Sequence, residues 1–84
     1  QNHQRSIWAL LAQATLEASN GNNLPAARLF KRSADSNFFD YDEEIMLYRK
    51  ALIHFAFDQK WGEAKQLLSE HPNLRAAITK RFQL

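Results

Sequence analysis

The chain has 84 residues, of which 45% are hydrophobic and 12% aromatic, and its formal net charge is +2 at pH 7. That length fits one small domain, and the apolar content is that of a folded chain rather than a disordered one. Two glycines and two prolines are too few for the turns of a β-sandwich, and the lack of cysteine excludes disulfides and Cys-ligated metals. No apolar run approaches the about 18 residues of a membrane span, so we expect none, and the sequence leaves the compartment open.

Long stretches of helix-forming residues predict an all-α fold, and the first helix spans about residues 6–19. Its apolar residues recur at the three- and four-residue spacing of one helix face. They are Trp8, Leu11, Ala12 and Ala18, and Ile7, Leu10 and Ala14 widen the face. Asn20 and Gly21 end this helix, because glycine readily adopts the left-handed backbone that follows a helix C-terminus.

A second predicted helix runs to about Ser36. Asn22 or Asn23 is expected to cap it, and Pro25 lies in its first turn, where the missing N–H removes no hydrogen bond. Small and large apolar residues form a seam that allows close helix packing, at Ala26, Ala27, Phe30 and Ala34. Three cations gather at helical spacing on its surface: Arg28, Lys31 and Arg32.

The connection over residues 35–42 breaks the helical pattern. It contains Phe38, Phe39 and Tyr41, which make it too apolar for a flexible linker, so we expect it to pack against the helices. Two interpretations remain open for these aromatic residues. They fill the gap between two helical hairpins, or, together with Phe57, they form an exposed patch of the kind that marks an interface.

The third predicted helix begins near Asp40 and runs to about Phe57. Asp40 lies three residues before Glu43, a spacing typical of helix capping, and the acidic first turn suits the helix dipole. Apolar residues lie on nearly all sides of this helix, which predicts that it is the central and most buried one. They are Ile45, Met46, Leu47, Tyr48, Ala51, Leu52, Ile53, Phe55, Ala56 and Phe57.

Two further helices are predicted, one over about residues 61–70 and one over about 72–83, with Pro72 between them. Their inward-facing residues are Ala64, Leu67 and Leu68 in the former, and Leu74, Ala77, Ile78 and Phe82 in the latter. From residue 60 onward the chain holds five basic and two acidic residues. This basic end indicates either a solvated helix surface or an acidic partner.

Two parts of the chain share a pattern in which bulky and small residues on one helix face alanine and larger apolar residues on the next. The members are Trp8, Leu11, Ala12, Ala26, Ala27 and Phe30 in one copy, and Tyr48, Ala51, Leu52, Ala64, Leu67 and Leu68 in the other. The pattern resembles the tetratricopeptide repeat and its RNA-processing relative, the half-a-TPR repeat. The resemblance implies one domain, a fragment of an α–α superhelix, with antiparallel hairpins at about 6–36 and 42–70 and a capping helix at about 72–83.

Members of this family are mostly scaffolds or adaptors that hold peptides, helices or RNA in a groove lined by the first helix of each pair. The resemblance therefore implies a non-catalytic role in binding a protein partner or other subunits of a complex. The groove positions are Ala9, Gln13, Leu16 and Glu17, and Met46, Arg49, Ile53 and Phe57. Arg49 resembles the cations by which some members clamp a C-terminal carboxylate, but their Asn partners are absent, so we expect a more apolar or helical ligand.

RNA binding or RNA processing is the alternative function. The basic residues that could contact phosphates are Arg28, Lys31, Arg32, Arg75, Lys80 and Arg81. They form one track only if they share a face, which the sequence does not establish. The acidic cluster after residue 40 and the small net charge weaken attraction for a polyanion, so a protein partner is favoured.

The sequence contains no recognisable catalytic, metal or cofactor motif. The three histidines, His3, His54 and His71, lack metal-ligand spacing, and no serine or threonine lies in a nucleophile elbow. The acidic residues 40–44 resemble the start of a calcium loop, but Ile45 stands where such a loop needs glycine. We therefore expect no enzyme activity, no cofactor and no small-molecule substrate.

Overall fold

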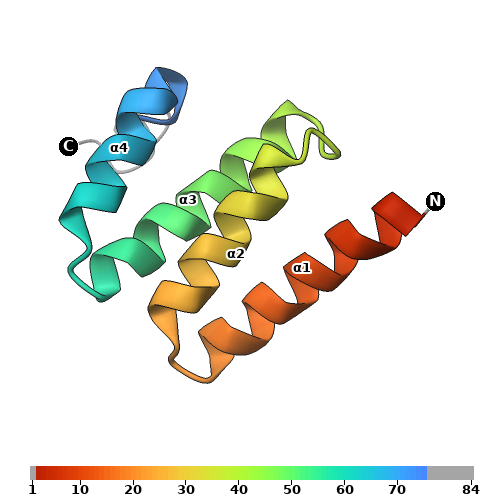
Figure 1. Ribbon diagram of the computed structural model, residues 1–84. Coiled ribbons are helices and arrows are strands. Elements are labelled where there is room, and N and C mark those ends of the chain that lie inside the picture. The colour runs from red at the N-terminus through yellow and green to blue at the C-terminus, as the bar shows by residue number, and fades with distance from the viewer. Residues whose placement is uncertain (1, 76–84) are drawn as a thin grey trace.

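The computed structural model describes the backbone of residues 2–75 and the side chains of residues 6–75, and this part of the chain is all-helical. Its helices are α1 (Asn2–Ser19), α2 (Asn23–Asp35), α3 (Tyr41–Phe57) and α4 (Trp61–Glu70). Residues 72–75 form a further helical turn. Successive helices run in alternating directions, so α1 pairs with α2 and α3 with α4 (Figure 1). The predicted all-α hairpin arrangement is confirmed.

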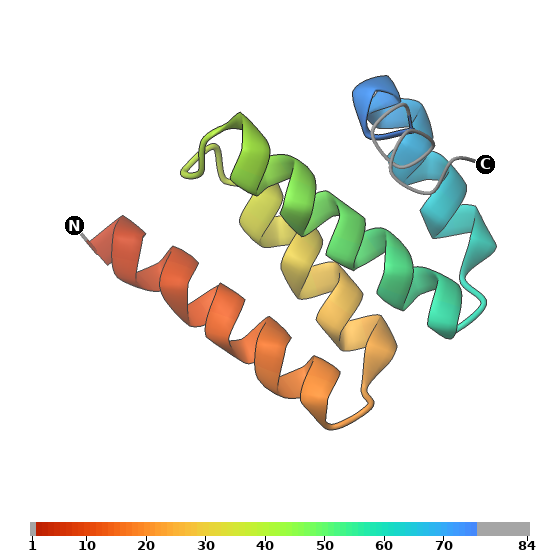
Figure 2. The same ribbon diagram turned by 180° about the vertical axis from the view of Figure 1, so that it is seen from behind.

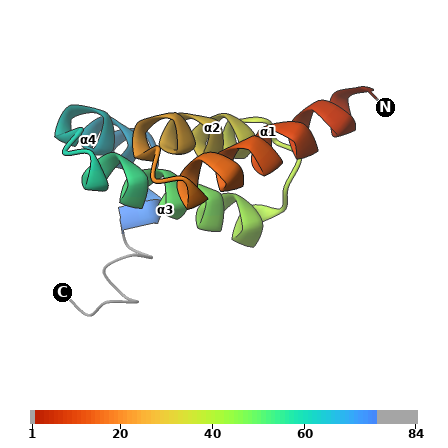
Figure 3. The same ribbon diagram turned by 90° about the horizontal axis from the view of Figure 1, so that it is seen from below.

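The central helix is α2, so the prediction that α3 is the most buried helix is wrong. Seen from below, α1, α2 and α4 lie in one layer and α3 lies beneath α2 (Figure 3). From behind, α3 runs along the length of α2 (Figure 2). Because α2 has neighbours on several sides, its small residues are enclosed: Ala26, Ala27, Phe30, Ser33 and Ala34 are buried. Among the helices of the described residues, none covers one side of α3, and apolar residues on that side are exposed.

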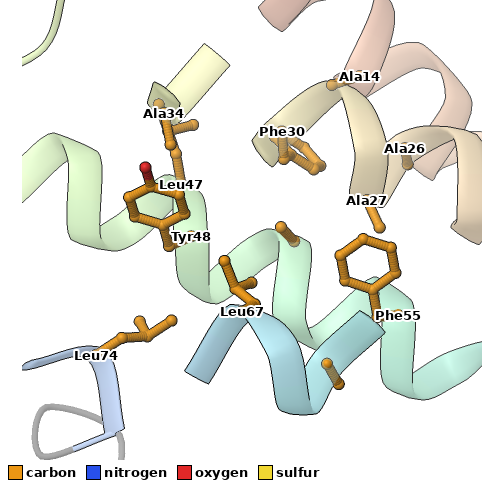
Figure 4. Packing of buried hydrophobic residues seen from close by; sticks show 12 residues of the cluster. Ala14, Ala26, Ala27, Phe30, Ala34, Leu47, Tyr48, Phe55, Leu67 and Leu74 are labelled. Atoms are coloured by element: carbon orange, nitrogen blue, oxygen red, sulfur yellow. The ribbon is translucent and has the colours of Figure 1, made fainter. Parts of the chain in front are cut away.

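The core draws side chains from all four helices and from the turn that follows α4 (Figure 4). Alanines on α2 allow α1 and α3 to pack close to α2. Larger side chains on α3 and α4 fill the space between α2, α3 and α4. The buried apolar cluster consists of Ala14, Ala26, Ala27, Phe30, Ala34, Leu47, Tyr48, Ala51, Phe55, Ala64, Leu67 and Leu74. None of the helices in the described residues is long and apolar enough to cross a membrane.

The predicted apolar face of α1 is confirmed only in part, since Leu11 and Ala18 pack against the core but two of its other members are exposed. Ile7 and Ala14 are buried, whereas Trp8 is 53% exposed and Ala12 is exposed. In the part of the chain that the structure describes, α2 is the helix that packs against α1, and Trp8 instead meets the connection between α2 and α3. Its ring packs edge-on against Phe38 and Phe39, with ring centroids 5.8 and 5.7 Å away.

That connection packs against a helix, as predicted. Phe38 and Phe39 are half-buried and also contact each other edge-on. They therefore fill the space between the hairpins, which supports the first interpretation for these two residues. Tyr41, in contrast, is mostly exposed at the start of α3.

Two of the predicted helix-end signals are confirmed and one is corrected. Gly21 has a φ of +79°, and the Asp40 carboxylate accepts a 2.9 Å hydrogen bond from the Glu43 N–H. Asn22 precedes α2 but its side chain does not cap the helix, and its amide N–H donates to the Glu17 carboxylate. The acceptor at this end of α2 is Asp58, which follows α3 and receives the Leu24 N–H at 3.0 Å. Capping by a residue so distant in sequence was not predicted.

The predicted bounds of α4 are confirmed, and Ala64 and Leu67 are buried while Leu68 is half-buried. The predicted fifth helix falls largely outside the described residues. Its start is seen in residues 72–75, where Leu74 is fully buried. The remaining predicted core positions, Ala77, Ile78 and Phe82, lie outside the described part of the chain.

Candidate functional site

A row of large apolar side chains lies exposed along α3. Met46, Ile53 and Phe57 are 47%, 43% and 66% exposed, respectively. Their spacing of seven and four residues places them on one side of the helix, and we name this row the α3 stripe. The opposite side of α3 carries the buried residues Leu47 and Ala51, which pack into the core. The stripe therefore faces away from the core formed by the described residues.

Two cations border the α3 stripe. Arg49 is half-buried, and its Nε atom is shielded from water without a hydrogen-bond partner. Lys50 is exposed, and its Nζ atom lies 5.7 Å from the centre of the Phe30 ring. Within the described residues neither Arg49 nor Lys50 forms an ion pair. The apolar row is thus combined with positive charge that no neighbouring carboxylate neutralises.

Two of the four predicted groove residues on α1, Gln13 and Glu17, form local side-chain hydrogen bonds. The Gln13 amide donates to the Glu17 carboxylate at 3.4 Å, and Glu17 also accepts from Asn22 at 2.8 Å. These bonds stabilise the turn between α1 and α2, and none of them reaches α3. Of the eight predicted groove positions, the structure groups the four on α3, and the other four lie on α1, where Ala9 and Leu16 are exposed. Lys50, which also borders the stripe, was not predicted, although it lies four residues after Met46.

The predicted phosphate-binding residues on α2 are largely occupied. Arg28 pairs with Glu63 of α4 at 3.3 Å. Lys31 lies 3.0 Å from Asp35 and 3.9 Å from Glu70. Both cations therefore join α2 to its neighbours instead of facing solvent unpaired.

The other basic candidates do not complete a track. Arg32 and Arg75 are exposed. Lys80 and Arg81 lie outside the described residues. Because the cations on α2 already meet carboxylates of α4, an RNA backbone would have to displace those carboxylates to bind there, and we therefore do not favour RNA binding.

A polar network holds the end of α2 against α3. The Tyr48 hydroxyl donates to Asp35, which also accepts from Lys31. Burial, and then the hydrogen bond to Asp35, raise the pKa of Tyr48. Burial alone would raise the pKa of Asp35, but the hydrogen bonds from Tyr48 and Lys31 outweigh it and the pKa is lowered. The Tyr48 ring also packs on the His71 ring at 4.0 Å. Each of these groups has a structural partner, so the network stabilises the fold.

A hollow of about 240 Å³ lies between α2, α3 and α4, lined by Lys31, Phe55, Glu63, Gln66 and Leu67. Its charged lining groups, Lys31 and Glu63, are those of the ion pairs between α2 and α4. Over the described residues, no three His, Cys, Asp or Glu side chains gather where they could hold a metal ion. The hollow thus belongs to the packing of α4 on the other helices.

We expect the stability of the protein to fall as the pH drops below about 6.5, the usual pKa of histidine, because of His54. Burial, and then nearby Lys50, lower the pKa of His54, and Asp58 offsets this only in part. The ring also stacks on Phe30 and lies 2.9 Å from the Asn23 amide oxygen. The unfolded chain therefore binds a proton at this histidine more readily than the folded one does.

Urea unfolding measured between pH 8 and pH 5.5 tests this expectation, since most carboxylates titrate below that range. In His54→Gln the decline between pH 7 and pH 5.5 should be smaller than in the unchanged protein. The same decline in both proteins would contradict a role for His54.

No family model matches this chain, and comparisons with curated proteins and with solved structures found no match either. The tetratricopeptide-like resemblance therefore stays a prediction.

Proposed function

We propose that this protein is a non-catalytic scaffold or adaptor that binds a protein partner through the α3 stripe. The observation that supports this is the exposure of Met46, Ile53 and Phe57 together on one side of an otherwise packed helix. Methionine and aromatic residues are enriched at protein interfaces, and a helix face with this spacing is a recurrent docking element. The tetratricopeptide-like resemblance, which was drawn from sequence alone, implies the same three positions.

The energy available from the stripe limits what it can do alone. Complete burial of one large apolar side chain contributes about 1.5–3 kcal/mol. These three are only about half exposed, so covering them contributes roughly 2–5 kcal/mol. Association costs an estimated 4–15 kcal/mol in lost freedom of motion. A partner must therefore contact further residues around the stripe to bind stably.

Site-specific photocrosslinking tests the proposed function. A benzoylphenylalanine placed at position 57 should give a discrete crosslinked product with a protein partner in cell extract. The same group at position 65, an exposed site on α4, should not give that product. Substituting Met46→Ala and Ile53→Ala should remove the product at position 57, because less apolar surface is buried on binding.

Far-UV circular dichroism provides the folding control for these variants. Their helicity should be unchanged, since both substituted side chains lie outside the buried core and are about half exposed. Identical products from positions 57 and 65, or a product that persists in the double variant, would show that the stripe does not bind the partner.

A further inference from the structure

We propose that the partner segment bound by the α3 stripe is an acidic amphipathic helix, whose apolar face is bordered by carboxylates that meet Arg49 and Lys50. This inference rests on the proposed function and specifies the chemistry of the partner. Three features of the described residues support it: the placement of the two cations, their lack of partners, and the charge at the start of α3.

The two cations lie on opposite borders of the stripe. An α-helix turns by about 100° per residue, so Arg49 lies roughly 60° to one side of the line through Met46, Ile53 and Phe57. By the same count Lys50 lies roughly 40° to the other side. A helix that covers the stripe with its own apolar face therefore presents its two borders to these cations. Carboxylates on those borders would complement them.

Both cations are held in place but lack a carboxylate. The half-buried Arg49 side chain has its Nε atom packed out of water, and Lys50 lies over the Phe30 ring. Among the side chains of residues 6–75, Arg49 makes no hydrogen bond or ion pair, whereas Arg28 and Lys31 on α2 each pair with a carboxylate of α4. A restrained cation loses less conformational freedom on binding, which favours a carboxylate ligand here.

The acidic first turn of α3 indicates how charges should be arranged along the partner helix. Asp42 and Glu43 are exposed there, and neither forms an ion pair in the part of the chain that the structure describes. They lie about seven residues before Arg49 and Lys50, or roughly 10 Å along the helix axis. A continuous polyanion such as RNA would place phosphates against these carboxylates. A partner helix can match both charged regions of α3. It would carry acidic residues opposite Arg49 and Lys50 and a basic residue about two turns away, opposite the acidic first turn.

Selection from a random 16-residue peptide display library tests the inference with the full chain immobilised. The unchanged protein should enrich peptides with apolar residues at helical spacing and Asp or Glu beside them. The variant Arg49→Gln with Lys50→Gln should enrich apolar peptides without the acidic residues. The variant Lys65→Gln removes an exposed cation from α4 and serves as the matched control, so its enriched sequences should equal those of the unchanged protein.

A peptide selected on the unchanged protein then gives the quantitative readout. Its affinity should fall about tenfold in the double glutamine variant and be largely retained in Arg49→Lys, because the charge persists. Apolar peptides without enriched acidic residues would overturn the inference and leave the proposed function standing. Enrichment of no peptide, or enrichment unaffected by Ile53→Asp in a variant with unchanged helicity, would overturn both.

Discussion

Replacing Phe55 with alanine is expected to lower the free energy of unfolding by about 3–5 kcal/mol. Phe55 is 1% exposed, and its ring lies between α2 and α4, where Ala27 points toward it (Figure 4). Removing the ring leaves a cavity that the surrounding helices cannot fill without moving. A domain of this size has roughly 4–12 kcal/mol of stability in total, so this single substitution removes a large share of it. Urea unfolding followed by circular dichroism measures the loss.

Phe57→Ala is the matched control, because it removes the same side chain two residues later on the same helix. Phe57 is 66% exposed on the α3 stripe, so its loss should change the free energy of unfolding by no more than about 0.5 kcal/mol. A loss as large as that of Phe55→Ala would place Phe57 in the core. It would then remove the basis for treating the stripe as a free surface.

Much of the secondary structure could be predicted because its signals are local. Asp40 and Gly21 mark helix ends through the chemistry of their own side chains and backbones, and the structure confirms both. The bounds of α4 follow in the same way from the turn before Trp61 and from Pro72 after Glu70. Such signals act within a few residues, so one sequence is enough to find them.

The prediction was wrong where burial depends on distant neighbours. Trp8 lies on an apolar face of α1, but whether that face is covered depends on which helix packs there. Among the described residues, Trp8 packs on the aromatic rings of the connection around Phe38 and stays about half exposed. A helix that is apolar on all sides is ambiguous in the same way. The pattern of α3 fits a fully enclosed helix as well as one that keeps an unpaired apolar side, and Met46 and Phe57 show that the latter is present.

The ion pairs between α2 and α4 were not predicted, because they too depend on residues distant in sequence. Arg28 and Glu63 are 35 positions apart, and their ion pair exists only because α4 folds back beside α2. The periodicity of α2 correctly grouped its cations but could not show that carboxylates face them. The resemblance to tetratricopeptide repeats, in contrast, implied Met46, Ile53 and Phe57 as groove positions, although the periodicity of α3 predicted a buried helix. Their role in binding stays a prediction.

Replacing Ala27 with leucine tests whether the contact between α2 and α3 has room for a larger side chain. Ala27 is fully buried on α2 and faces the Phe55 ring (Figure 4), so a larger side chain forces α2 and α3 apart. The expected loss is about 1–3 kcal/mol. In a domain of this size that corresponds to a fall in Tm of roughly 4–20 °C, which a thermal scan by circular dichroism measures. Arg32→Leu, an exposed site on the same helix, is the control and should leave the Tm nearly unchanged.

Combining Ala27→Leu with Phe55→Ala tests whether these two side chains pack directly against each other. Two substitutions that destabilise the protein independently would give a different result. If the two side chains share one space, the introduced leucine occupies part of the cavity left by the missing ring. The double variant should then be more stable than the sum of the two single losses predicts, because residues in contact do not act additively. Strict additivity would mean that Ala27 and Phe55 are not neighbours and that α2 does not pack on α3 through its alanine seam. The position of the α3 stripe depends on that packing, since it fixes which side of α3 is left uncovered.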